Sequence, residues 1–268
     1  AGIQHRDANA AVVEQQILVV PENALEHGHV DVLAIQIHVA AVLAVVARFE
    51  HDVDLVSTFT TRSYVLDFGT LIAEGPTTEV LAEGKSAAQV RVTAHVDGRE
   101  IFCALGATAH RKAGRIEAAF ESFPSVPPPE EAPPFQLPLP AAMRAAAAKA
   151  LRNIEMRSAP PLPGSGVPKS RLTLWARVPG SPATPAVMAY LADMVPLSIA
   201  RAAERAGGGT SIDNTMRFAG ATAEEWVLLD LDPHLASGGY GHGGLLLWSP
   251  GGELLATGGQ TASLMLFD

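Results

Sequence analysis

The sequence contains a single cysteine, Cys103, among its 268 residues. One thiol can form neither an internal disulfide nor a cysteine-based zinc site, which excludes a disulfide-stapled secreted scaffold and a zinc finger. Basic residues are also scarce, since 19 Lys and Arg stand against 28 Asp and Glu and the net charge is −9. Neutralising phosphates needs a basic face, so we expect no nucleic-acid partner. The lack of paired thiols leads us to expect a reducing, cytoplasmic location.

The chain also lacks an apolar run of the ~20 residues that a membrane-spanning helix needs. Its longest apolar run, residues 32–47, includes Gln36 and His38, and we expect a buried core helix there. The first seven residues show no signal-peptide pattern. With 48% hydrophobic and 18% charged residues, the chain is too apolar to be disordered. We therefore expect a soluble, folded protein without a membrane span.

Proline is concentrated in one stretch, where eight of the 17 residues from Pro124 to Pro140 are proline. Proline cannot donate a backbone hydrogen bond, so this stretch predicts an extended connector that runs over a surface. The alanine-rich residues 141–154 within the connector predict a short helix. We therefore expect three parts: an N-terminal domain over 1–120, a linker over 121–170 and a C-terminal domain over 171–268.

The two flanking segments repeat one order of elements. The first predicts a helix followed by extended segments, at 30–49, 54–65, 87–96 and 100–110, the last two joined by the hairpin signal Asp97-Gly98. The second predicts a strand, a helix and four strands, at 171–178, 185–205, 211–218, 226–231, 241–248 and 253–261. A helix that is apolar on all faces must be covered on all faces, and a curved sheet can do this. The pattern predicts an α+β fold of two antiparallel sheets, each wrapped around a long central helix.

The second of these helices contains an isolated carboxylate. Thr184 and Pro185 predict its start, as N-cap and first helical residue, and Asp193 is its only charged side chain up to Ala200. A carboxylate in apolar surroundings is costly to bury unless it is paired or protonated, and such a group suits a general base near neutral pH. Asp193 could instead face a water-filled crevice or satisfy a nearby backbone group.

Two further polar positions could complete a site with Asp193. Residues 208–215 place hydroxyls and amides, Ser211 among them, at a strand start after a glycine run, where a small polar residue can hold a water or a carbonyl oxygen. Gln260 lies within an otherwise apolar closing strand, where its donors and acceptor need partners. An ordinary turn and strand, and a structurally satisfied glutamine, are the alternatives.

The second half of the chain resembles a known family through four motifs in order, at 189–193 (AYLAD), 210–218 (TSIDNTMRF), 224–228 (EEWVL) and 252–261 (GELLATGGQT). Over about 172–264 these motifs resemble the C-terminal half of the acyl-CoA thioesterase II (TesB-like) double hot-dog family. In that family an aspartate on the second helix, a threonine or serine opening the next strand and a glutamine on the last strand activate a water. The resemblance assigns these roles to Asp193, Ser211 and Gln260, with serine replacing the commoner threonine.

The first half is similar to the N-terminal hot dog of the same family, through its motifs at 55–59, 79–86 and 90–100. It departs from the family before residue 50, where residues 29–32 offer no glycine pair to open the helix. Offsets of 155 and 154 residues superpose the two halves, and the counterparts of Asp193, Ser211 and Gln260 are then His38, Val56 and Gly106. The first repeat therefore lacks the water-activating set, and we expect one competent site per chain.

The resemblance implies a thioester hydrolase that converts fatty acyl-CoA to free fatty acid and CoA and needs no cofactor. Asp193 would take a proton from a water held by Ser211 and Gln260, and backbone N–H groups at a helix N-terminus would stabilise the oxyanion. The chain has no G-x-S-x-G nucleophile elbow, so no covalent acyl-enzyme is expected. The alternative is a non-catalytic acyl-CoA or lipid-binding hot dog; a hot-dog dehydratase would normally want a histidine base.

A nucleotide-binding function is a further alternative. Residues 50–56 and 64–75 are similar to the C-terminal part of ABC-transporter ATPase subunits, in which the histidine senses the γ-phosphate. Such a subunit needs a phosphate-binding loop upstream, G-x-x-x-x-G-K-[ST]. The only Gly-Lys-Ser, residues 84–86, lies downstream and has Glu79 in place of the first glycine. ATP binding without thioesterase activity would favour this alternative.

Other candidate ligands carry weaker signals. His27, His29 and His51 lie near one another in sequence but form no H-E-x-x-H pattern, so we expect no metal site. His242 lies between two glycines, and we expect it at a turn or at the edge of a strand. Coenzyme A is polyanionic and needs a local basic patch, for which Lys169, Arg171 and Arg177 are candidates by position alone. Two fused hot dogs could assemble further into a homo-oligomer through exposed sheet faces.

Overall fold

The computed structural model describes part of the chain in detail. The described residues are 12–18, 63–67, 70–75, 78–85, 87–96, 99–109, 116, 118–137 and 151–267. The long helix predicted over 30–49 and most of the short helix predicted over 141–154 lie outside them, and residues 151–153 form a turn. Of the helices in the described ranges, none combines the length and the apolar character that a membrane crossing requires.

Antiparallel strands dominate the described fold. The N-terminal half contributes β1 (Val12–Leu18), β2 (Ser63–Asp67), β3 (Thr70–Gly75), β4 (Thr78–Glu83), β5 (Ala87–Val96) and β6 (Arg99–Ala109). The C-terminal half contributes β7 (Glu155–Ser158), β8 (Leu172–Arg177), β9 (Ala206–Phe218), β10 (Val227–Ser237), β11 (Tyr240–Trp248) and β12 (Leu254–Phe267). The predicted β5–β6 hairpin and all five predicted C-terminal strands are confirmed, although β9 starts earlier and β10 and β12 end later than predicted.

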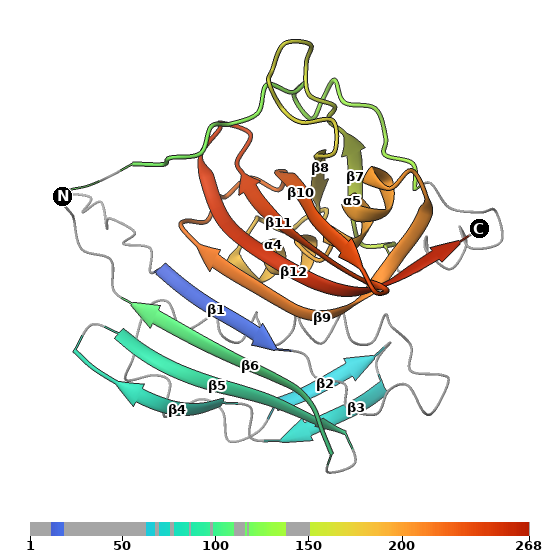
Figure 1. Cartoon of the computed structure of the whole chain (residues 1–268). Helices are drawn as coiled ribbons and strands as arrows, with labels where there is room; N and C mark the ends of the chain where they lie inside the picture. The colour runs from blue at the N-terminus through green and yellow to red at the C-terminus, as the bar shows by residue number, and fades with distance from the viewer. Residues whose placement is uncertain are drawn as a thin grey trace, which may run out of the picture.

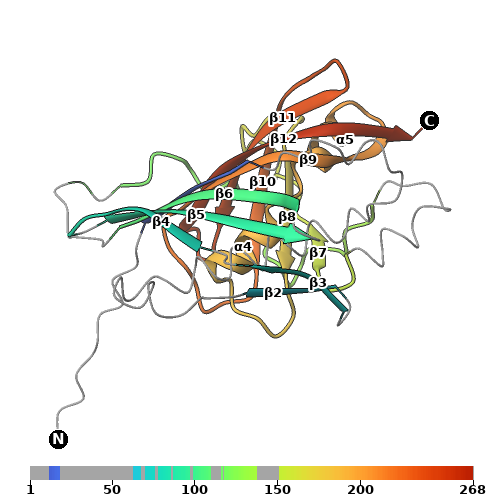
Figure 2. The ribbon, with the colours of Figure 1, turned by 90° about the horizontal axis from the view of Figure 1, so that it is seen from below.

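The strands of both halves share one sheet. Ten strands lie in the order β4-β5-β6-β1-β9-β12-β11-β10-β8-β7, while β2 and β3 form a separate hairpin. Figures 1 and 2 show the strands β4, β5, β6 and β1 of the N-terminal half continuing into β9, β12 and β11 of the C-terminal half as one curved layer, with β2 and β3 apart from it. The join is β1, which the sequence reading did not predict and which pairs with β6 on one side and β9 on the other. The two sheets expected from the sequence are therefore continuous, because one central strand supplies hydrogen bonds to both halves.

The single helix predicted over 185–205 is instead two helices, α4 (Pro185–Leu191) and α5 (Val195–Ala202). The reason is Pro196, which has no backbone N–H and whose ring would clash with the carbonyl four residues earlier in a continuous helix. The predicted start is confirmed, since the Thr184 side chain accepts a hydrogen bond from the N–H of Val187. Asp193 lies in the short turn between α4 and α5.

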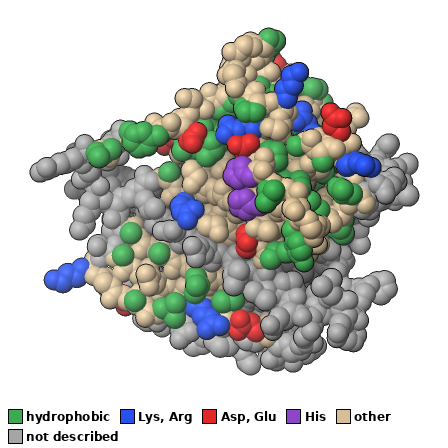
Figure 3. Space-filling view, viewed as in Figure 1, with side chains coloured by type: hydrophobic (Ala, Val, Ile, Leu, Met, Phe, Trp, Pro, Cys, Tyr) green, Lys and Arg blue, Asp and Glu red, His purple; other side chains and the backbone are tan. Residues whose placement is uncertain are grey.

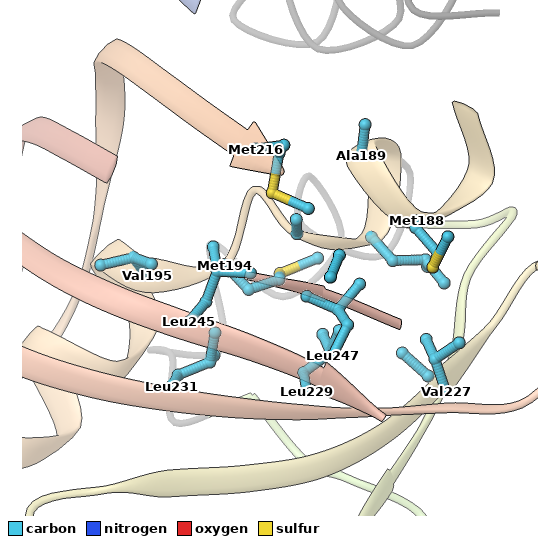
Figure 4. Packing of buried hydrophobic residues seen from close by; sticks show 14 of the residues in the cluster. Met188, Ala189, Met194, Val195, Met216, Val227, Leu229, Leu231, Leu245 and Leu247 are labelled. Carbon is cyan, nitrogen blue, oxygen red and sulfur yellow. The ribbon is translucent and has the colours of Figure 1, made fainter. Parts of the chain in front are cut away.

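Both helices pack against the same face of the C-terminal strands. Figure 4 shows Met188, Met194 and Val195 next to leucines of β10 and β11, and all of them are buried. The strand leucines are Leu229, Leu231, Leu245 and Leu247. This apolar packing holds the turn with Asp193 against the sheet, because displacing it would return the methionines to water.

The proline-rich connector covers the opposite face of the sheet. The indole N–H of Trp175 donates to the Pro127 carbonyl at 2.8 Å, and the rings of Phe123 and Trp248 meet edge to face at 5.7 Å. A second buried cluster, which includes Ala132 and both tryptophans, lies under the connector. Within the stretch that the sequence assigns to the linker, Glu155–Ser158 form the edge strand β7. The sheet is thus buried on both faces in this region.

Candidate functional site

Three separate elements supply the polar side chains that the sequence singles out. Asp193 lies in the α4–α5 turn, Ser211 within β9 rather than at its start, and Gln260 in the middle of β12. Because β9 and β12 are neighbours in the sheet and α5 packs on both, the three positions converge although 67 residues separate Asp193 from Gln260. Asp193 and Ser211 are partly buried, and Gln260 is fully buried.

These three side chains form a closed hydrogen-bonded cluster. The Ser211 hydroxyl donates to Asp193 Oδ1 at 2.7 Å. The Gln260 amide nitrogen donates to Ser211 Oγ at 2.7 Å and also to Asp193 Oδ1. The Asp193 carboxylate, which looked isolated in the sequence, therefore receives a hydroxyl and an amide from two strands. Hydrogen bonds to an ionised acceptor are stronger than those between neutral groups, so this cluster holds the carboxylate firmly in place.

The orientation of the Gln260 amide is set by the start of α5. The backbone N–H of Val195 donates to Gln260 Oε1 at 3.2 Å. With its oxygen facing a donor, the amide must present its NH₂ group to Asp193 and Ser211. A helix start leaves N–H groups without intrahelical partners, and Gln260 satisfies one of them. Packing of α5 and orientation of the site are thereby linked through one side chain.

A β-bulge in β9 determines which of its residues share the face of Ser211. Thr261 is opposite Asp213 and Ala262 is opposite Ser211, so Ile212 is the extra residue in β9. The shift places Asn214 directly opposite Gln260. The sequence marks Asn214 only as part of the polar stretch 208–215. In a regular strand, Ser211 and Asn214 would lie on opposite faces because they are three residues apart, and only the bulge puts them on the same face.

The expected oxyanion donors are not supplied by the start of α5. The N–H of Val195 is taken by Gln260, Pro196 has none, and the N–H of Leu197 donates to the Met194 carbonyl at 3.1 Å.

In the first repeat, the counterparts His38 and Val56 lie outside the described residues, while Gly106 lies in β6 opposite Gln15 and Val90.

Two of the proposed coenzyme A ligands are engaged in ion pairs. Arg177 contacts Glu155 at 2.6 Å and Glu225 at 2.9 Å, and its guanidinium lies over the Trp226 ring. Hydrogen bonding to Arg177 lowers the pKa of Glu155, and the same contact raises the pKa of Arg177. The two carboxylates balance the positive charge of Arg177, so this residue does not form a basic patch for a phosphate.

Arg171 is likewise matched by two carboxylates, Asp230 at 3.2 Å and Asp232 at 3.3 Å. Asp230 is fully buried, and this burial raises its pKa to about 6 despite the nearby guanidinium, which lowers it. Lys169 is exposed, and its carbonyl accepts a hydrogen bond from Arg201. The expected basic patch is therefore neutralised at both arginines.

His234 of β10 and His242 of β11 lie side by side at the surface, where Figure 3 shows a purple patch. Their Nδ1 atoms are 3.3 Å apart, and Asp232 is 3.9 Å from Nε2 of His234. His242, predicted at a turn or strand edge, thus lies within β11 and contacts His234. Across the ranges that the structure describes, His, Cys, Asp and Glu form no group of three that could hold a metal ion.

Solved structures with the same architecture come from several bacteria. A protein assigned to the thioesterases, from Novosphingobium aromaticivorans, shares 29% identity over 96% of both chains, with a TM-score of 0.66. Acyl-CoA thioesterase II from Mycobacterium marinum shares 23% identity over 88% of this chain and 91% of its own, with a TM-score of 0.61. A protein of unknown function with a hot-dog fold, from Alicyclobacillus acidocaldarius, shares 18% identity over 98% and 95%, with a TM-score of 0.63.

The fold of the described strands and helices is therefore a hot-dog fold. No curated protein matches the chain in sequence. The sequence profile of the acyl-CoA thioesterase C-terminal domain, in contrast, matches residues 124–264, which include Asp193, Ser211 and Gln260. Since this match covers more than half of the chain, the chain belongs to the acyl-CoA thioesterase family.

Proposed function

We propose that this protein hydrolyses fatty acyl-CoA to free fatty acid and CoA, with Asp193, Ser211 and Gln260 as its catalytic residues. The observation that carries the proposal is the convergence of a hydroxyl and an amide on one carboxylate in a mainly apolar setting. Family membership supports the thioester as substrate. The double hot-dog arrangement, with a second helix supplied by the first half, is part of the same proposal.

The proposed reaction is direct attack by water. Asp193 accepts one proton from the water while the oxygen of the water bonds to the thioester carbonyl carbon, and the product of this step is a tetrahedral oxyanion. The oxyanion then collapses, the carbon–sulfur bond breaks, and the proton passes from Asp193 to the departing thiolate. Ser211 and Gln260 hold the carboxylate in the position of the base, because each donates a hydrogen bond to Oδ1. Holding the base and the water in place lowers the entropic cost of the step.

Hydrolysis of a panel of acyl-CoA esters, from acetyl to long-chain, tests the activity through release of free thiol. The proposal expects catalytic turnover and no acyl adduct on the protein by mass spectrometry. Tight binding of acyl-CoA without turnover would instead support the non-catalytic binding protein. ATP binding in the absence of thioesterase activity would support the nucleotide-binding alternative.

Replacing the proposed base tests its assignment. Asp193→Asn keeps the side-chain volume and removes the proton acceptor, so turnover should fall by ~10²–10⁴ while the fold persists. Glu224→Gln is the matched control, since it removes a carboxylate at an exposed position and should leave turnover unchanged. Near-UV circular dichroism checks that the variants are folded. Wild-type turnover in Asp193→Asn would remove Asp193 from the mechanism.

A further inference from the structure

Both ends of the Gln260 amide have hydrogen-bond partners within the cluster. Its oxygen accepts from Val195, and its nitrogen donates to both Asp193 and Ser211. The Ser211 hydroxyl has one proton, which it donates to Asp193. An attacking water has two protons, and Asp193 can take only one of them. A further buried acceptor beside Asp193 would hold the other proton and so aim the lone pair of the water at the thioester carbon.

Asn214 lies beside this cluster on the same face of the sheet. It is directly opposite Gln260 in the β9–β12 register, and side chains of opposite residues lie about 5 Å apart on one face. Met216, two residues further along β9, is buried in the cluster that packs against the helices. Asn214 therefore points toward the helix side, and it is 4% exposed.

The carbonyl oxygen of Asn214 is buried without a hydrogen-bond partner. Three other buried polar atoms in the described ranges share this property, and they belong to Arg171, Asp230 and Trp248. Trp248 lies in the second cluster under the connector, and Asp230 alternates with the helix-facing Leu229 and Leu231. Among the described residues, Asn214 Oδ1 is thus the one such acceptor on the helix side of the sheet. A buried, unpaired acceptor is costly to the fold, and such groups in native proteins often serve function.

We propose that Asn214 is a further catalytic residue, whose side-chain oxygen accepts a hydrogen bond from the second proton of the attacking water. This inference rests on the proposed function. The amide of Asn214 is uncharged and cannot take the proton away, so it orients the water while Asp193 acts as the base. No bond to Asn214 forms or breaks, and the atoms of the reaction remain those of water and thioester.

Asn214→Leu tests the proposal because leucine has a similar shape and no acceptor. We expect kcat to fall by roughly 10²-fold, comparable with the loss of one positioned hydrogen-bonding group, with KM changed less than about threefold. The melting temperature should stay the same or rise, because the substitution removes an unsatisfied polar atom from the interior. Thr215→Val, the next residue of β9 and on the other face, is the control and should keep wild-type kcat.

The outcomes separate this proposal from its alternatives. Wild-type kcat in Asn214→Leu overturns it, as does a rise in KM with kcat unchanged, which would assign Asn214 to substrate binding. Loss of activity together with a lower melting temperature also overturns it, because that pair of changes marks a structural role. A wild-type protein that hydrolyses no acyl-CoA ester refutes the proposed function itself, whereas an active wild type with an active Asn214→Leu refutes only the role of Asn214.

Discussion

The Gln260 side chain shows why a glutamine, rather than a shorter or charged residue, stands in the closing strand. Its oxygen must face the N–H of Val195, and its nitrogen must reach Asp193 and Ser211. A glutamate would present an acceptor to the Asp193 carboxylate, and an apolar residue would leave the Val195 N–H without a partner. One neutral amide satisfies both neighbours.

Asp230 is a residue whose ionisation should make the free energy of unfolding depend on pH. Its pKa in the folded protein is raised to about 6 by burial, above the ordinary 3.8. The folded state therefore binds the proton more tightly, and the resulting stabilisation, on the order of 2–3 kcal/mol at most, is present below the ordinary pKa and is lost as the pH rises through about 6.

Asp230→Asn should flatten this dependence between about pH 4 and pH 7. The free energy of unfolding, measured by urea titration across that range, should fall less steeply with pH in the variant than in the wild type. Glu224→Gln, which removes a carboxylate at an exposed position, is the control. Equal slopes for Asp230→Asn and the wild type would contradict the raised pKa.

At the scale of elements, the close approach of α5 to the sheet depends on Gly243 of β11. A Cβ at this position would lie 2.7 Å from the Asp232 carbonyl and 2.7 Å from Val195 Cγ1. Gly243 is also directly opposite Gln260 in the β11–β12 pair. The absence of a side chain at Gly243 thus leaves room for Val195, whose N–H orients the Gln260 amide.

Gly243→Ala should therefore reduce stability and activity together. Overpacking at such a contact costs about 1–3 kcal/mol, and moving Val195 away from Gln260 should lower kcat. Thermal unfolding and acyl-CoA hydrolysis measure the two effects. Gly208→Ala is the matched control, because nothing lies within 4 Å of its would-be Cβ. If both variants behave alike, the close approach at Gly243 does not position α5.

At the scale of the whole molecule, β1 connects the two halves through backbone hydrogen bonds. Gln16 is opposite Leu105 of β6 and Thr215 of β9, so its N–H and carbonyl lie between two strands. Without β1, both neighbouring strands would present an open edge at this point. The continuity of the sheet therefore depends on seven residues near the start of the described fold.

Gln16→Pro should destabilise the molecule by about 3 kcal/mol, because proline removes a hydrogen bond from a central strand. Gln16→Ala keeps the backbone N–H and should leave stability within about 0.5 kcal/mol of wild type. Chemical unfolding compares the two variants. A stable Gln16→Pro protein would show that β1 does not join the halves.

Local chemistry in the sequence determined much of the architecture. The Asp97-Gly98 hairpin signal, the Thr184 cap and the apolar strand from Leu172 mark elements through residues that are near neighbours in the chain. The break in the predicted helix was also readable, because Pro196 cannot continue a helix whatever surrounds it. Asp193, Ser211 and Gln260 were assigned by the resemblance, and the spacing of their motifs placed them on separate elements.

Only the tertiary structure decided which distant groups meet. The position of β1 between β6 and β9 and the bulge at Ile212 are matters of strand pairing, and pairing depends on partners far along the chain. The bulge brings Ser211 and Asn214 to one face of β9, and burial in the folded protein is the main cause of the raised pKa of Asp230. A sequence specifies what each residue can donate or accept, whereas register and burial, which arise only on folding, determine the partner it finds.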